Sequence, residues 1–254
     1  MRVHIEASLQ YFLPQPTDIL LVVEVIPMQD QFIIEDLLTV KGCGPLRVVD
    51  GGDNLGRRTW MEANGALDVL YTATVGIDRA VPNVTGLPIT PRRELPAEAI
   101  PYLFPSRYCE SDRFEDFVNE TFGHVSGGDA INAISNWVYN NLSYVSGASD
   151  ADTTAINTFQ SQQGVCRDYA HLLIALSRAA GVPARMVSVY ALGLSPPDFH
   201  AVVEVWLAGK WHLIDATRLA PPEHFVRIAV GRDATDISFL TSFGQAEFNY
   251  QSIT

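Results

Sequence analysis

The sequence has few cysteines, few basic residues and no long hydrophobic run, and each shortage excludes a class of protein. Its three cysteines, Cys43, Cys109 and Cys166, are too sparse for a disulfide framework and lack the spacing of a zinc site. The chain has 17 Lys and Arg against 29 Asp and Glu, a net charge of -12, which argues against a nucleic-acid or anionic-membrane surface. The longest apolar run near the start, residues 19–23, is too short to span a bilayer.

The chain start also lacks the long apolar stretch of a signal peptide. We therefore expect a cytoplasmic protein with reduced thiols and no membrane partner. No loop has the spacing of a nucleotide, calcium or zinc site, so no cofactor and no metal are predicted. The sequence leaves the oligomeric state open.

The first part of the chain has the pattern of β structure. Residues 1–80 contain runs of β-branched and aromatic residues between glycine and proline turns, with no helical periodicity. They predict an N-terminal antiparallel β-sandwich, with a hairpin turn at Asn64-Gly65. Residues 81–105 carry six prolines, which remove backbone donors and indicate a linker.

Residues 106–254 show helical patterns followed by strands, which makes the fold class α+β, with helices packed on an antiparallel sheet. The last predicted helix begins near Gly164-Val165-Cys166 and is apolar nearly all round, as in a central buried helix. At such a start, unpaired backbone N–H groups and the helix dipole favour the thiolate form of cysteine. Cys166 is therefore the candidate nucleophile, whereas the other two cysteines are expected to be small buried hydrophobes.

His200 and Asp215 lie at the open end of a predicted hairpin. If its loop at Ala208-Gly209 has an even length, Trp206 pairs with Trp211, and Asp215 lies on the same face as His200. The side chains of His200 and Asp215 are then diagonal neighbours on one face of the sheet, at roughly 7–8 Å. A loop of odd length would place them on opposite faces.

A carboxylate that binds one imidazole nitrogen orients the other nitrogen toward a nucleophile. Cys166, His200 and Asp215 therefore form a candidate catalytic triad for acyl transfer through a thiol. The backbone N–H of Cys166 is a natural oxyanion donor. The second donor stays open among five upstream residues: Trp137, Tyr144, Gln160, Gln162 and Gln163.

Other polar residues near these positions have simpler interpretations. Arg167 and Asp168 are expected to form ion pairs at the helix start, and His171 is expected to be structural. Glu204 shares a face with His200, where it either lines the cleft or is solvated.

The motifs around the triad resemble those of the transglutaminase-like superfamily, in particular bacterial transglutaminase-like cysteine proteases. The resemblance covers most of the chain and is most specific around the cysteine. It rests on residues 164–171, 181–185, 200–205 and 211–217, with weaker support from 105–112, Arg227 and 230–236.

The resemblance implies an N-terminal β-sandwich domain at 1–80, a linker at 81–105 and a papain-like catalytic domain at 106–254. It also implies that Cys166, His200 and Asp215 are catalytic. The usual Asp-Pro-Thr motif is Asp215-Ala216-Thr217 here, which keeps the aspartate.

On this basis we expect a thiol-dependent amide hydrolase, a cysteine protease with a thioester intermediate, that acts on a peptide or protein substrate. The alternatives are a protein-glutamine acyl transferase, a related thiol acyltransferase such as an arylamine N-acetyltransferase or a peptide glycanase, and a non-catalytic interaction module with a vestigial triad.

Overall fold

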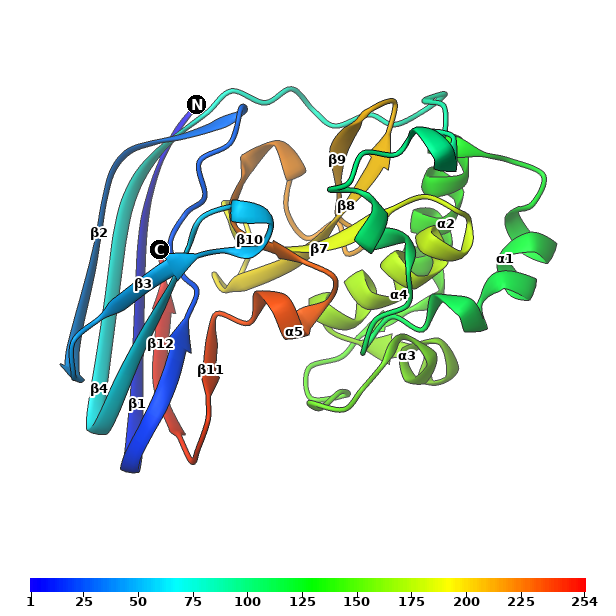
Figure 1. The fold of residues 1–254 in the computed structure, drawn as a ribbon. Helices are drawn as coiled ribbons and strands as arrows, with labels where there is room; N and C mark the ends of the chain where they lie inside the picture. Colours follow the sequence, from blue (N-terminus) through cyan, green and yellow to red (C-terminus); the bar gives the residue numbers. More distant parts are fainter.

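The computed structural model describes all residues, 1–254. A large sheet lies on one side, a four-stranded sheet in the centre and most of the helices on the other side (Figure 1). The large sheet contains β1 (Arg2–Leu21), β2 (Gln31–Cys43), β3 (Arg47–Asp50), β4 (Arg57–Ile77), β11 (Leu240–Ser242) and β12 (Glu247–Ile253). The predicted α+β class with antiparallel sheets is confirmed.

The four-stranded sheet is antiparallel, in the order β10-β7-β8-β9. Its strands are β7 (Ala184–Ala191), β8 (Phe199–Leu207), β9 (Lys210–Ile214) and β10 (Phe225–Gly231). A short parallel pair joins β5 (Ser143–Tyr144) to β6 (Gln163–Gly164).

The α-helices are α1 (Glu115–Phe122), α2 (Gly127–Asn141), α3 (Ala155–Ser161), α4 (Cys166–Ala179) and α5 (Ala234–Ile237). Single 3-10 turns lie at Gly52–Asn54, Arg92–Glu94, Ile100–Leu103, Ser111–Arg113 and Pro222–His224. Helix α4 packs against β7 and β8, and its side chains from Asp168 to Arg178 are all buried, as its apolar sequence predicts. No helix has the length and apolar content needed to cross a membrane.

The predicted hairpin at Asn64-Gly65 is wrong, because β4 runs straight through it. Both β1 and β2 pair with β4, and these ladders override the local turn preference. Between the pairs Leu13–Gly65 and Thr17–Ala63, three residues of β1 lie opposite Asn64, so β1 bulges here. On the other side, residues 64–67 of β4 lie opposite Gly42 of β2, so the predicted turn is an irregular stretch within a long strand. Gly65 accommodates it with a φ of 78°.

The end of the chain returns to the first sheet, since β11 and β12 both pair with β1. Residues 1–80 therefore do not form the predicted β-sandwich by themselves, because all their strands belong to one six-stranded sheet that also includes β11 and β12. A continuous apolar core runs from this sheet to α4. At the contact with the four-stranded sheet, Tyr71 stacks on Tyr190 with ring centroids 6.4 Å apart. The division into domains at residues 81–105 stays a prediction.

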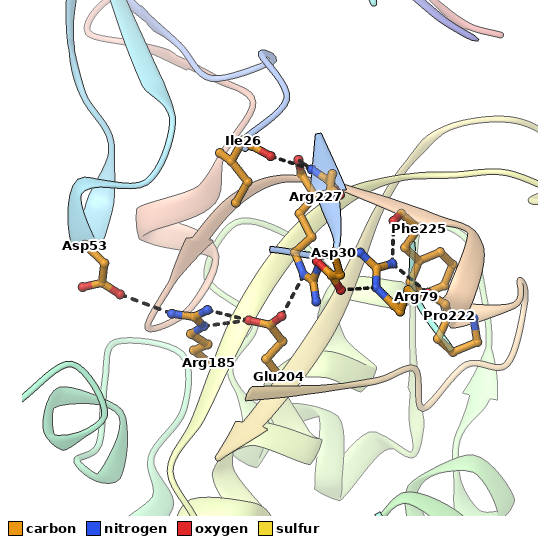
Figure 2. Close-up of polar contacts among 10 residues, drawn as sticks. Ile26, Asp30, Asp53, Arg79, Arg185, Glu204, Pro222, Phe225 and Arg227 are labelled. Atoms are coloured by element: carbon orange, nitrogen blue, oxygen red, sulfur yellow. Dashed lines mark hydrogen bonds and ion pairs between the residues drawn. The ribbon is translucent and has the colours of Figure 1, made fainter. Parts of the chain in front are cut away.

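A row of charged side chains also joins the two sheets (Figure 2). Glu204 on β8 lies at its centre and is fully buried. One carboxylate oxygen accepts from Arg185 Nε at 2.8 Å, and the other accepts from Arg227 Nε at 2.7 Å. Each arginine also forms an ion pair with an aspartate near the large sheet. Arg185 pairs with Asp53 at 3.4 Å, and Arg227 pairs with Asp30 at 2.8 Å. Glu204 is therefore neither solvated nor in a cleft, and its buried ion pairs hold the strand that carries His200.

Candidate active site

Cys166 is the first residue of α4, as predicted. Val165 before it is extended, with φ −112° and ψ −175°. The Asp168 side chain in the first turn accepts hydrogen bonds from the Val165 backbone N–H at 2.8 Å and from the Ser149 hydroxyl at 2.6 Å. These bonds fix the helix start, and they leave Cys166 partly exposed at the end of a buried helix.

The hydrogen bond between Asp168 and the Val165 backbone also requires a glycine at position 164. A Cβ atom at this position would lie 2.6 Å from the Cβ of Asp168, closer than real side chains approach. Arg167 pairs with Asp168 at 3.1 Å, which confirms the expected ion pair at the helix start. The glycine before the cysteine thus lets a buried carboxylate cap the helix.

The hairpin that carries His200 and Asp215 has the predicted even loop. Ala208 and Gly209 both have positive φ values, 49° and 78°, as in the tight two-residue turns that match the twist of a hairpin. Trp206 pairs with Trp211, which confirms the register.

His200 and Asp215 meet in a buried position. His200 Nε2 lies 2.9 Å from Asp215 Oδ2, and the two residues are only 2% and 7% exposed. The other carboxylate oxygen accepts from the Thr217 backbone N–H at 2.8 Å and from its hydroxyl at 2.7 Å. Both oxygens are therefore occupied, and the carboxylate is held rigidly. The sequence reasoning missed Thr217, although the Asp-x-Thr spacing is typical of such local capping.

The structure also brings His200 to Cys166. Burial alone lowers the pKa of the imidazole, but hydrogen bonds to Asp215 and Cys166 outweigh it and raise the pKa to about 9. His200 is therefore protonated at neutral pH. Asp215 occupies Nε2, which leaves Nδ1 as the ring nitrogen for a partner other than Asp215.

Among the five candidate oxyanion donors, Tyr144 has a hydrogen-bond contact with Cys166. The pairing of β5 with β6 sets Tyr144 beside Gly164, two residues before the cysteine. The pKa of the Tyr144 hydroxyl is raised to about 12, mainly because the side chain is partly buried. Contact with the Cys166 side chain raises this pKa further, whereas a hydrogen bond from the Cys166 backbone N–H lowers it. Trp137 instead stacks on Phe159 in an aromatic cluster.

The other histidines near these elements have structural contacts. His171 is fully buried, accepts from the Ala234 backbone N–H at 3.2 Å and stacks on Tyr108, which confirms its structural role. His212 lies 3.1 Å from the Leu207 carbonyl. No group of three or more His, Cys, Asp or Glu side chains is arranged to hold a metal ion.

Comparison with solved structures gives a match over the whole chain. It is the crystal structure, from Cytophaga hutchinsonii, of what is described as "a Putative Cysteine Protease". The two chains are 35% identical, and the TM-score is 0.93. The match covers 100% of this chain and 89% of the other, so the two share both the large sheet and the helical half.

Comparison by sequence points the same way over the central region. The model of the transglutaminase-like superfamily matches residues 115–216. An uncharacterized protein of Mycobacterium leprae is 28% identical over 117 residues, 43% of this chain and 42% of the relative. A protein-glutamine gamma-glutamyltransferase of Pseudomonas aeruginosa is 30% identical over 117 residues, 42% of this chain and 18% of the relative. The matched region thus spans less than half of these curated relatives.

Proposed function

Because this chain belongs to the transglutaminase-like superfamily, we propose that it is a thiol-dependent amide hydrolase of the cysteine protease type. Cys166 is the nucleophile, His200 the general base and acid, and Asp215 the group that orients His200. The observation that carries the proposal is the rigid Asp215–His200 pair, which leaves Nδ1 of the imidazole for a partly exposed cysteine at a helix start.

In the first half-reaction the sulfur attacks the carbonyl carbon of the amide, and the thiol proton resides on His200. The tetrahedral intermediate collapses as His200 donates that proton to the leaving amine, which breaks the C–N bond and leaves a thioester on Cys166. In the second half-reaction His200 takes a proton from water as the hydroxide adds to the carbonyl carbon of the thioester. The C–S bond then breaks, the carboxylic acid leaves, and the proton on His200 is shared again with the sulfur of Cys166.

The intermediate carries a negative charge on oxygen, and two donors are available for it. One is the backbone N–H of Cys166, in the first turn of α4, and the other is the Tyr144 hydroxyl. Donors that are fixed in advance at such an oxygen are worth roughly 10²- to 10³-fold in kcat each. Tyr144 is thus the second oxyanion donor in this proposal.

A second candidate is acyl transfer to an amine, in place of hydrolysis. It is favoured by the similarity to the Pseudomonas aeruginosa protein-glutamine gamma-glutamyltransferase over 117 residues. Both reactions share the thioester and differ only in the group that attacks it.

One experiment tests the proposal and separates the two reactions. Glutamine-containing peptides are incubated with the wild type and with Cys166→Ala, with and without a primary amine, and the products are identified by mass spectrometry. Hydrolysis gives acid products, and transfer gives an amine adduct. The wild type should exceed Cys166→Ala by roughly 10⁴-fold or more, the scale of losing a nucleophile. Equal turnover in the two proteins would reject the assignment.

A further inference from the structure

Arg218 extends from the loop that fixes the Asp215 carboxylate. It directly follows Thr217, which donates two hydrogen bonds to Asp215. Its φ is +55°, in the left-handed region that side chains other than glycine rarely adopt. Strained backbone of this kind persists where the surrounding structure determines it, and it is concentrated at functional sites. The position of Arg218 relative to Asp215 is therefore fixed.

The guanidinium of Arg218 is also held in place. Its Cζ lies 4.2 Å from the centroid of the Tyr139 ring, and it donates a hydrogen bond to Asn136 Oδ1. Both residues lie on α2, whose end leads into β5 and Tyr144. Arg218 thus joins the loop that follows Asp215, the partner of His200, to the helix that leads into Tyr144, and both His200 and Tyr144 contact Cys166.

This cation has no carboxylate partner, although acidic residues outnumber basic ones by 29 to 17 in the chain. None of the ion pairs in the structure involves Arg218, whereas Arg167 beside the cysteine is paired with Asp168. Arg218 is exposed, and most of its five N–H donors are free. A planar guanidinium that is fixed in advance binds a carboxylate with two parallel hydrogen bonds.

We propose that Arg218, on its platform of Tyr139 and Asn136, is a subsite for a carboxylate of the acyl substrate. The inference rests on the proposed function and deepens it, since it names the substrate class as peptides that carry a negative charge close to the amide under attack. That carboxylate is either an acidic side chain or the C-terminal carboxylate.

The test uses three alkylating probes that need only a reactive thiol. They are iodoacetyl-Gly-Glu-amide, with a side-chain carboxylate, iodoacetyl-Gly-Gln, with a terminal carboxylate, and the neutral iodoacetyl-Gly-Gln-amide. The rate of alkylation at Cys166 is followed by peptide mass spectrometry in the wild type, Arg218→Gln and Arg47→Gln. Arg47 is an exposed arginine on β3, so its replacement controls for the change in net charge.

In the wild type, at least one charged probe should react about 10-fold faster than the neutral probe, the scale of a charge-assisted hydrogen bond. The faster of the two identifies the source of the carboxylate. Arg218→Gln should bring the ratio to about one, with the neutral rate unchanged within about two-fold, while Arg47→Gln keeps the ratio.

Equal rates for all three probes in the wild type would overturn the proposal, as would a ratio that survives in Arg218→Gln. An equal slowing of charged and neutral probes in Arg218→Gln would also reject it, because the residue would then act through the placement of Asp215. Failure of the proposed function is a separate result, seen as equal peptide turnover by the wild type and Cys166→Ala.

Discussion

Replacing Glu204 by glutamine tests whether the buried charge row in Figure 2 holds the two sheets together. The substitution keeps the size of the side chain and removes its charge. It leaves Arg185 and Arg227, which are 2% and 4% exposed, without their shared carboxylate, and it turns an amide NH₂ toward one of them. Removing one partner of a buried ion pair costs roughly 3–5 kcal/mol, because the remaining charge stays buried.

For a chain of this size, 1 kcal/mol corresponds to roughly 2–4 °C in Tm, so Glu204→Gln should melt roughly 6–20 °C below the wild type. The matched control is Glu94→Gln, which breaks an exposed pair with Arg93, where the side chains are 57% and 84% exposed. A pair of this kind contributes about 1 kcal/mol at most, so the control should melt within about 4 °C of the wild type. Differential scanning calorimetry of the three proteins measures both shifts. If Glu204→Gln melts no lower than the control, the charge row does not stabilise the fold.

Three further predictions concern the site itself. The pKa of His200 is raised from 6.5 to about 9, so the contribution of this residue to stability is complete below pH 6.5 and is lost as the pH rises through 9. The free energy of unfolding of the wild type, measured with urea, should therefore fall by about 3 kcal/mol across this range. The same fall in His200→Ala would refute the assignment. Tyr144→Phe should lower kcat by roughly 10²-fold or more with little change in KM, and an unchanged kcat would remove Tyr144 from the oxyanion site. Gly164→Ala should melt below the wild type, because its Cβ meets Asp168 at 2.6 Å; an unchanged Tm would show that the helix start adapts.

The local features of the site were predictable because short-range rules determine them. A glycine before an apolar helical run predicts the start of α4 at Cys166. The two-residue loop at Ala208-Gly209 fixes the register of the hairpin, and with it the face shared by His200 and Asp215. In each case the decisive contacts join residues close together in the sequence.

Features that depend on distant partners were not predictable from the sequence. The alternation of side chains along β8 predicts which face of the sheet Glu204 lies on. It does not predict the arginines of β7 and β10 that form ion pairs with Glu204. The C-terminal strands pair with β1 at the opposite end of the chain, and no local pattern marks that pairing. The prediction of a turn at Asn64-Gly65 was wrong for the same reason, because the strands that pair with β4 on either side lie elsewhere in the sequence.

The reactivity of Cys166 at pH 6 tests the central claim most directly. Cys43 was predicted to be buried but is partly exposed, and burial of part of its side chain raises the pKa of its thiol, so it serves as an unactivated cysteine in the same molecule. If His200 activates Cys166, iodoacetamide at pH 6 should alkylate Cys166 at least about 10-fold faster than Cys43, and His200→Ala should remove this difference. Equal rates at the two cysteines in the wild type would contradict the account of an activated nucleophile.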